Sequence, residues 1–228
     1  MRVAEIYKSV QGEGFLSGTP SVFVRTSGCN LRCWFCDTPY TSWTPEGSDL
    51  SLDAVIAQVA EWDTRYVVLT GGEPMLQAEL IPLAQRLQSA QRHITVETAG
   101  TLYLPVACDL MSISPKLSNS TPSPQRDAAW SRRHEATRHQ PEVMRRLLAE
   151  YPYQVKFVVD SRADCDEIHA YLAQFPEIAT DRVMLMPQGT DAATLERTGS
   201  WLESYCRREG WHFCPRQQIH WFGLVRGT

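Results

Sequence analysis

Residues 28–37 read Gly28-Cys29-Asn30-Leu31-Arg32-Cys33-Trp34-Phe35-Cys36-Asp37, and the interpretation of the chain starts here. Three cysteines fall within eight residues, in the pattern Cys-x-x-x-Cys-x-x-Cys. Thiols this close together usually hold a metal centre, because otherwise they are oxidation-prone neighbours. A structural zinc site or a ferredoxin-type cluster needs a fourth ligand, and no second pair of ligands lies nearby in the sequence. The pattern therefore favours a four-iron cluster with one open iron over zinc or redox-sensing thiols.

The composition is that of a globular protein without a disulfide framework. The chain has 228 residues, of which 43% are hydrophobic and 21% charged, and this excludes fibrous and disordered classes. A net charge of −4 gives no basic field, so we expect no direct nucleic-acid or membrane partner. No apolar run spans a bilayer and the N-terminus does not resemble a signal peptide, so we expect a cytoplasmic location. The remaining cysteines are expected to be small buried side chains: Cys108, Cys165, Cys206 and Cys214.

Short β-branched runs alternate with longer amphipathic runs. Strands are predicted at residues 3–7, 21–26, 66–70, 93–97, 110–114, 153–159 and 183–186. Helices are predicted at residues 52–59 (capped by Ser51), 76–87, 141–149, 163–175 and 191–208. This order predicts a single α/β domain over residues 1–228 with a parallel sheet. The chain is too short for a full eight-unit barrel, so an incomplete barrel or an open sheet is expected.

Polar or glycine-rich loops follow nearly every predicted strand. They comprise residues 11–14, 28–29, 71–74, 98–101, 115–116 and 187–189. Carboxyl ends of parallel strands meet at one edge of a sheet, so a site is predicted at that edge. Residues 117–140 are rich in Ser, Pro, Arg and His and are predicted to form a long loop or lid.

The cysteine motif, with Phe35 before its last cysteine, resembles that of the radical S-adenosylmethionine (SAM) superfamily. The segment Gly71-Gly72-Glu73-Pro74 resembles the glycine-rich motif of the same superfamily. The resemblance implies a truncated β/α barrel and a 4Fe-4S cluster held by Cys29, Cys33 and Cys36. It also implies that SAM binds the open iron and is cleaved to a 5′-deoxyadenosyl radical, which removes a hydrogen from the substrate.

Further segments are similar, in order, to the 7-carboxy-7-deazaguanine synthase family within this superfamily. They are residues 11–14, 23–25, 28–31, 36–38, 70–74, 97–98, 114–117, 156–159 and 187–189. The resemblance implies conversion of 6-carboxy-5,6,7,8-tetrahydropterin to 7-carboxy-7-deazaguanine with loss of ammonia, as in queuosine biosynthesis. It further implies Mg²⁺, a flavodoxin- or ferredoxin-like electron donor and a homodimer.

The same resemblance implies roles for individual residues. The implied pterin-binding residues are Val10, Gln11, Gly12, Arg25, Thr70 and Thr228. The implied SAM-binding residues are Phe35, Cys36, Asp37, Gly72, Ser114, Pro115, Lys116, Pro187, Gln188 and Gly189. Thr38 is implied as a Mg²⁺ ligand, and Asp37 and His220 as proton-transfer residues. One departure is Ala99, which stands where a polar residue is expected.

Two alternatives stay open from the sequence. The first is another radical SAM enzyme, such as a glycyl-radical activase, which shares the cysteine motif but needs a protein-docking surface and no pterin site. The second is a non-catalytic zinc or iron–sulfur module, which holds metal without cleaving SAM. Metal and sulfide analysis, together with turnover of the carboxypterin, separates the three.

Overall fold

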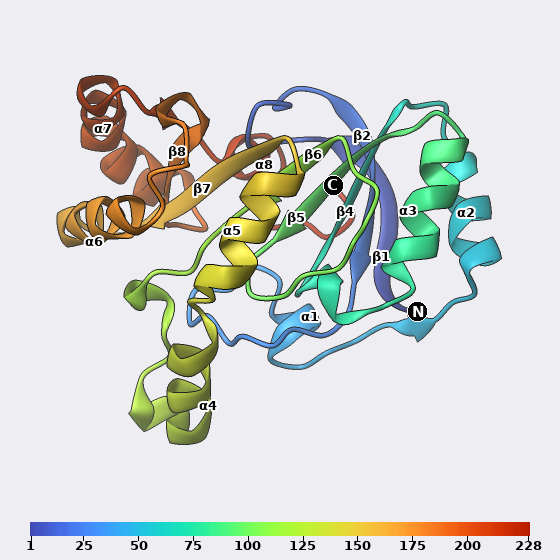
Figure 1. Ribbon diagram of the computed structural model, residues 1–228, viewed down its shortest axis with the longest axis horizontal. Coiled ribbons are helices and arrows are strands. Elements are labelled where there is room, and N and C mark those ends of the chain that lie inside the picture. Colours follow the sequence, from blue (N-terminus) through green and yellow to red (C-terminus); the bar gives the residue numbers. More distant parts are fainter.

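A nine-stranded sheet runs through the computed structural model, which describes all residues 1–228 (Figure 1). In spatial order the strands are β3 (Ser48–Asp49), β1 (Arg2–Val10), β2 (Pro20–Thr26), β4 (Tyr66–Gly71), β5 (His93–Thr98), β6 (Leu110–Ile113), β7 (Tyr153–Val159), β8 (Val183–Pro187) and β9 (His212–Phe213). From β2 to β9 each strand is parallel to its neighbour. The sheet does not close on itself, so the predicted incomplete barrel is confirmed.

Helices connect most of the parallel strands. They are α1 (Pro39–Ser42), α2 (Leu52–Ala60), α3 (Leu80–Ser89), α4 (Pro124–Thr137), α5 (Pro141–Glu150), α6 (Arg162–Gln174), α7 (Ala192–Glu209) and α8 (Gln217–Phe222). The Ser51 hydroxyl accepts a hydrogen bond from the Ala54 N–H at 3.1 Å, and so caps α2 as expected. The prediction of one helix over 76–87 was wrong at its start, because Pro74–Leu76 form a 3₁₀ turn before α3.

The first two strands form an antiparallel hairpin rather than a parallel pair. Val10 of β1 lies opposite Pro20 of β2, so residues 11–14 lie at the end of the sheet where β2 begins. Our expectation that this loop joins the others at the carboxyl edge was wrong. The physical reason is the short connection of residues 11–19, since a parallel crossover needs a dozen or more residues.

The segment 117–140 is largely helical, which corrects the prediction of a long loop. A 3₁₀ turn at Ser118–Ser120 precedes α4, which is kinked at Asp127 and projects from the body of the fold (Figure 1). Pro124 occupies the first turn of α4, and the Ser123 hydroxyl accepts from the Arg126 N–H at 3.3 Å. The helix was missed because its sequence is mostly polar and carries no periodic apolar face.

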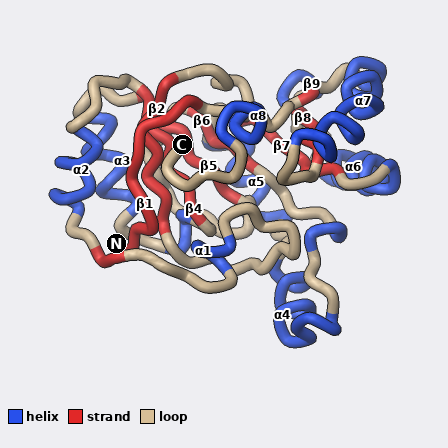
Figure 2. The backbone as a smooth tube through the Cα atoms, turned by 180° about the vertical axis from the view of Figure 1, so that it is seen from behind, coloured by secondary structure: helices blue, strands red, loops and turns tan.

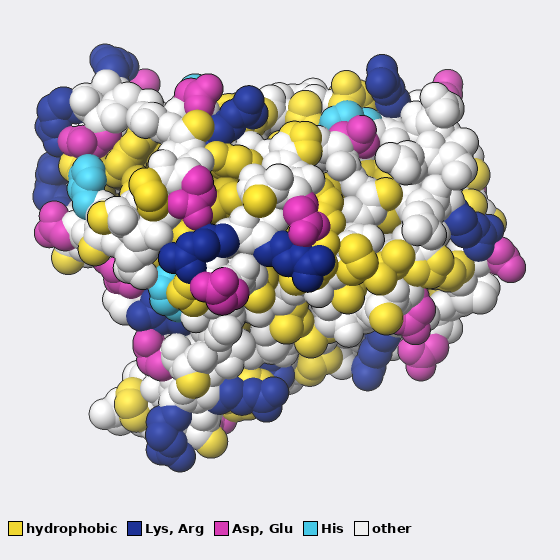
Figure 3. All heavy atoms as spheres, in the orientation of Figure 1, with side chains coloured by type: hydrophobic (Ala, Val, Ile, Leu, Met, Phe, Trp, Pro, Cys, Tyr) yellow, Lys and Arg dark blue, Asp and Glu magenta, His cyan; other side chains and the backbone are white.

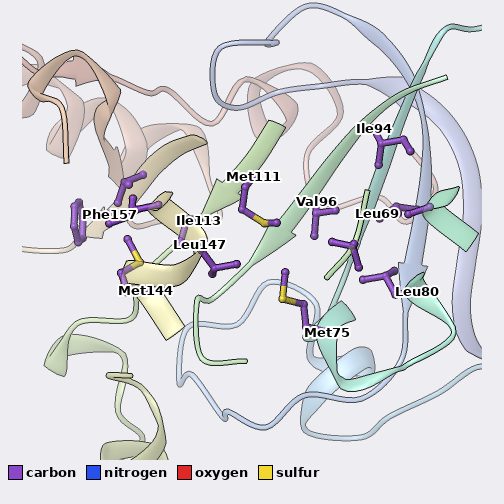
Figure 4. Packing of buried hydrophobic residues seen from close by; sticks show 14 of the residues in the cluster. Leu69, Met75, Leu80, Ile94, Val96, Met111, Ile113, Met144, Leu147 and Phe157 are labelled. Carbon is purple, nitrogen blue, oxygen red and sulfur yellow. The ribbon is translucent and has the colours of Figure 1, made fainter. Parts of the chain in front are cut away.

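Strand side chains alternate between a hydrophobic core and a polar interior. The core lies between the sheet and helices α2, α3, α5, α6 and α7, and Figure 4 shows Leu69, Val96, Ile113 and Phe157 within it. Their neighbours Thr70, Glu97, Ser112 and Lys156 face the other side of the sheet. On that side lie α8 and the chain end (Figure 2). None of the helices combines the length and apolar character needed to cross a bilayer.

Candidate active site

The polar side of the sheet encloses a cavity of about 320 Å³, a size typical of small-molecule sites. Inward-facing side chains of seven strands line it, and residues 223–228 at the chain end close one side. The strand residues include Glu5, Tyr7, Arg25, Thr70, Glu97, Ser112, Lys156 and Met186. The cavity therefore runs along the inside of the partial barrel and extends beyond its carboxyl edge.

The cysteine loop follows β2 and is fixed by backbone contacts from two other segments. Gly28 adopts a φ of 107°, a conformation that favours glycine. Its N–H donates to the Thr41 carbonyl at 2.8 Å, and its carbonyl accepts from the Glu73 N–H at 2.9 Å. Backbone hydrogen bonds thus hold the loop between α1 and the segment after β4. Its three cysteines, Cys29, Cys33 and Cys36, all line the cavity.

The three cysteines fit an iron–sulfur cluster. All three are free thiols of intermediate exposure. Burial raises the pKa of Cys29 and of Cys33 to about 12, so each thiolate needs compensating positive charge, which a bound iron supplies. No three His, Cys, Asp or Glu side chains are grouped closely enough to hold a single metal ion. Three thiols that line one cavity suit a cluster that leaves one iron open.

Gly72 allows the segment after β4 to approach the cysteine loop. A Cβ atom on Gly72 would lie 2.3 Å from the Gly28 carbonyl oxygen and 2.8 Å from Cys29 Cβ. Only a residue without a side chain fits there unless the backbone moves. The glycine therefore sets the distance between the cysteine loop and the neighbouring strand end.

The Glu73 carboxylate joins two loops beneath the cavity. It is buried, and it accepts hydrogen bonds from the Thr98 hydroxyl at 2.9 Å and from the Ala99 N–H at 2.9 Å. Ala99 thus contributes through its backbone, which explains how a residue without a polar side chain serves at this position. Burial raises the pKa of Glu73, and these donors oppose that effect.

Arg25, the second-last residue of β2 and close to the cysteine loop, is held by two partners. Its Nε donates to Glu5 Oε1 at 2.7 Å and its Nη2 donates to the Tyr7 hydroxyl at 2.6 Å. The Tyr40 hydroxyl donates to the same Glu5 oxygen at 2.7 Å. The guanidinium is therefore rigidly oriented, and its Nη1 keeps its donors for a ligand.

Lys156 is the centre of a buried charge network. Its Nζ lies 3.0 Å from Glu13 Oε2 and 3.2 Å from Glu97 Oε1, and the Thr70 hydroxyl donates to Glu97 Oε2 at 2.9 Å. Burial alone would lower the pKa of the Lys156 ammonium, but Glu97 and Glu13 raise it above its ordinary value. Burial would raise the pKa of Glu13, but Lys156 and Arg216 lower it to about 2. Lys156 and Glu13 are therefore both charged near neutral pH.

Arg216, before α8, extends this network to the cysteine loop. Its guanidinium contacts Glu13 Oε1 at 3.4 Å, donates to the Gly189 carbonyl at 2.6 Å and binds the Asp37 carboxylate. The Gln218 side chain donates to Glu13 Oε1 at 2.6 Å. The C-terminal segment thus holds together Glu13, at the end of the cavity where β2 begins, and Asp37, beside the last cysteine.

Most residues implied by the family resemblance meet in this one cavity. Those that line it are Val10, Gln11, Gly12, Arg25, Phe35, Cys36, Asp37, Thr38, Thr70, Gly72, Ser114, Lys116, Gln188 and Thr228. Those that do not line it are Pro115, Pro187, Gly189 and His220.

His220 lies on α8 with its side chain exposed, beside a separate groove of about 220 Å³ that also contains Glu196 and Glu203. This placement lends no support to the expected proton-transfer role.

Six charged residues of the cavity were not among the expected site residues: Glu5, Glu13, Glu97, Lys156, Arg216 and Arg226. Two of them carried a signal in the sequence. Lys156 and Glu97 are ionisable residues inside strands that otherwise read as apolar, and strand alternation turns them away from the core. The sequence around Arg216 did not predict its place in the site, because its partners come from distant parts of the chain.

Comparison with known proteins agrees with this site. Residues 23–119 match the family described as the Radical SAM superfamily. Two similar proteins are named 7-carboxy-7-deazaguanine synthase. That of Rhodopirellula baltica is 46% identical over 227 residues, covering 99% of this chain and 88% of its own. That of Halobacterium salinarum is 42% identical over 227 residues, covering 95% of this chain and 88% of its own. The crystal structure of QueE from Escherichia coli shares the fold, with a TM-score of 0.70 and 22% identity. The match covers 94% of this chain and 92% of that chain.

Proposed function

The chain belongs to the 7-carboxy-7-deazaguanine synthase family of radical SAM enzymes, and from this premise we propose how its cavity divides the reaction between its residues. The substrate is 6-carboxy-5,6,7,8-tetrahydropterin, and the product is 7-carboxy-7-deazaguanine, with loss of ammonia. Family membership sets aside both the glycyl-radical activase and the non-catalytic metal module. One observation supports this assignment of roles: the three thiols line the same ligand-sized cavity as the charged side chains.

The cluster end of the cavity is the part that the cysteine loop lines. Cys29, Cys33 and Cys36 would hold the cluster, which would supply the electron for reductive cleavage of bound SAM. Phe35 and Asp37 flank the last cysteine and line the cavity, as does Lys116, whose Nζ is fixed by the Ser114 carbonyl at 2.8 Å and the Ser114 hydroxyl at 2.7 Å. These side chains orient SAM, and Gly72 keeps the adjoining backbone close.

The pterin site is lined by inward-facing side chains of the strands. Arg25 binds the substrate carboxylate through the Nη1 donors that its protein partners leave free, an interaction suited to a planar guanidinium. Glu97 and Thr70 accept or donate hydrogen bonds at the pterin ring, and Gln11 and Gly12 contact it from the end of the cavity where β2 begins. Thr228 lines the same space and is a further contact for the pterin.

Proton transfer falls to residues that already line the cavity. Loss of ammonia requires a proton donor for the departing nitrogen and a base for the carbon skeleton. Lys156 is protonated and buried against Glu97, so this pair can hold a proton beside the substrate. Asp37 is a second candidate at the cluster end. His220 is replaced in this role, because it lies outside the cavity.

Thr38 and Asp37 would supply the oxygen atoms for a magnesium ion. Mg²⁺ prefers hard oxygen ligands and keeps several waters, so two protein ligands suffice. The Thr38 hydroxyl lines the cavity and lies 3.4 Å from the Thr41 hydroxyl. The ion would stabilise negative charge on the substrate.

We also propose that the enzyme is a homodimer and receives its electron from a flavodoxin- or ferredoxin-like protein. The exposed apolar side chains of Trp221, Phe222, Leu224 and Val225 support the first proposal, because they would be covered in a dimer. Sedimentation velocity tests it, and a purely monomeric enzyme would contradict it.

The experiment that tests the function is anaerobic reconstitution followed by turnover. With reductant, SAM and the carboxypterin, the enzyme should form 7-carboxy-7-deazaguanine, methionine and 5′-deoxyadenosine, detected by mass spectrometry. Cys33→Ala should abolish all three while far-UV circular dichroism stays unchanged, since the core does not depend on the cluster. Cys108→Ala is the matched control and should retain turnover. SAM cleavage without the deazaguanine product would refute the substrate assignment.

A further inference from the structure

We propose that α4 and the outer side of the cysteine loop form a docking surface for an acidic protein that delivers one electron to the cluster. We call it the arginine surface, and define it by Arg32, Arg126, Arg132, Arg133 and Trp34. The proposal rests on the proposed function, because only a cluster enzyme needs such a donor. It adds the place of docking and the residues that recognise the donor.

The arginine surface carries unneutralised positive charge on a protein whose net charge is −4. None of its four arginines forms a salt bridge, and Arg126, Arg132 and Arg133 are exposed. Figure 3 shows dark-blue side chains gathered over α4, the lobe at the lower left. A negatively charged partner is therefore attracted here and repelled by much of the remaining surface.

The acidic residues of α4 offset only part of this charge, because there are two of them, Asp127 and Glu135, and Glu135 is paired with Arg138. Asp127 Oδ1 accepts from the Trp130 N–H at 2.9 Å. Glu135 pairs with Arg138 at 2.9 Å and also binds the Thr121 hydroxyl. Arg138 therefore lies outside the arginine surface, and the four defining arginines outnumber the one remaining carboxylate of α4, that of Asp127.

The arginine surface is attached directly to the cysteine loop. The Arg32 N–H donates to His134 Nδ1 of α4 at 3.1 Å, and the Trp34 N–H donates to the Ser120 carbonyl at 3.1 Å. The Trp34 indole N–H donates to the Asn119 carbonyl at 2.7 Å. A protein docked on α4 thus lies against the segment that carries Cys33 and Cys36. Electron transfer requires a short distance between donor and cluster. A donor docked on α4 would be separated from the cluster only by the cysteine loop.

Aromatic rings hold two of the guanidinium groups in place. Arg32 stacks over Trp130 at 4.0 Å and Arg126 over Trp43 at 3.9 Å from the ring centroids. The Trp43 indole N–H donates to the Cys33 carbonyl at 3.0 Å. Trp34 is 44% exposed beside them, a residue type enriched at the centres of interfaces. The surface is therefore preformed and combines charge with an aromatic anchor.

The electron balance is simple. The reduced donor loses one electron, the cluster gains it, and the oxidised donor dissociates to be reduced again elsewhere. A low-potential flavodoxin fits this role by its chemistry, because it is an acidic one-electron carrier. Docking by charge also allows fast release, since such contacts mainly accelerate association and weaken with salt.

The test compares two triple variants of the cluster-loaded enzyme. Arg126→Glu/Arg132→Glu/Arg133→Glu reverses the charge of α4, and Arg65→Glu/Arg197→Glu/Arg207→Glu makes the same change of net charge at exposed arginines elsewhere. Oxidised flavodoxin is titrated into each by calorimetry at low salt. The α4 variant should bind at least about tenfold more weakly than wild type, whereas the control should stay within about twofold.

A second readout separates docking from chemistry. Dithionite is a small reductant that needs no docking surface, so it should support equal SAM cleavage in all three proteins. With reduced flavodoxin, cleavage should fall at least about tenfold in the α4 variant only. If dithionite yields no cleavage in wild type, the proposed function fails, while the binding data still judge the surface. The proposal would be overturned if both triple variants bound flavodoxin equally weakly, or if wild type did not bind it. It would also be overturned if α4 bound bulk tRNA in place of flavodoxin.

Discussion

The guanidinium of Arg216 binds the carboxylate of Asp37, although 179 positions separate the two residues in the chain. The same guanidinium contacts Glu13, which pairs with Lys156. One side chain from the C-terminal segment therefore connects the cysteine loop with the hairpin loop and with the middle of the sheet. The two ends of the cavity are held at a fixed separation, which a reaction between bound SAM and a bound pterin requires.

The first prediction concerns this connection. Arg216→Gln removes the positive charge shared by Asp37 and Glu13, so both ends of the cavity lose a common anchor. We expect kcat to fall by about 10- to 100-fold, a loss typical of small misplacements of reacting groups. Product formation under dithionite measures it. Arg197→Gln, a change at an exposed arginine of α7, is the control and should leave kcat unchanged; equal effects would contradict the role of Arg216.

The second prediction concerns Lys156. Lys156→Met keeps the length of the side chain but leaves Glu13 and Glu97 without their buried cation. Removing one partner of a buried ion pair costs about 3–5 kcal/mol, so the melting temperature should drop and turnover should be lost. Lys8→Met makes the same change at an exposed lysine without an ion pair and should alter neither. A stable, active Lys156→Met enzyme would show that the network is dispensable.

Much of the architecture could be predicted because its causes are local. All seven expected strands are present, and α2 begins at its Ser51 cap, since alternation and capping act within a few residues. The cysteine loop was identified for the same reason. The antiparallel start of the sheet was missed because strand direction depends on the length of the connection between residues 10 and 20 and not on the strands themselves.

The remaining features of the site depend on contacts between distant residues. Glu13, Lys156 and Arg216 meet only once the chain has folded, so their spacing in the sequence says nothing of the network. His220 illustrates the opposite case. Its place in the sequence suggested a role, but the orientation of α8 leaves it exposed beside another groove, while Gln218 of the same helix lines the cavity.

The third prediction concerns Gly72. In Gly72→Ala the new methyl group would meet the Gly28 carbonyl and Cys29, and the cysteine loop would have to move away. We expect the iron content after reconstitution, or the SAM cleavage rate, to fall at least about tenfold, because metal ligands tolerate little displacement. Gly199→Ala, within α7, meets only the end of the Phe213 ring and should behave as wild type. Full activity in Gly72→Ala would show that the close approach is unnecessary.

The fourth prediction concerns pH. His134 is buried, with Nδ1 accepting from the Arg32 N–H and Nε2 at 2.8 Å from the Ser120 hydroxyl, and burial lowers its pKa to about 4. Between pH 6.5 and pH 4 the unfolded state binds a proton that the folded state does not. The free energy of unfolding contributed by His134 should therefore be complete above pH 6.5 and decline by about 3 kcal/mol as the pH falls to 4.

Urea unfolding of the cluster-free protein across this range measures the effect. In His134→Gln the slope of stability against pH should become shallower, since no group titrates at that position. His212→Gln, at an exposed histidine, should retain the wild-type slope. Parallel profiles for wild type and His134→Gln would contradict the prediction.

The most direct test of the account is electron paramagnetic resonance of the reduced, anaerobically prepared enzyme, with and without SAM. We predict about four irons per chain and a 4Fe-4S signal that changes when SAM is added, with hyperfine coupling to isotopes placed in the amino and carboxylate groups of SAM. The signal should be absent in Cys33→Ala and present in Cys108→Ala. A signal that SAM leaves unchanged, or a protein that contains zinc and no sulfide, would contradict the account.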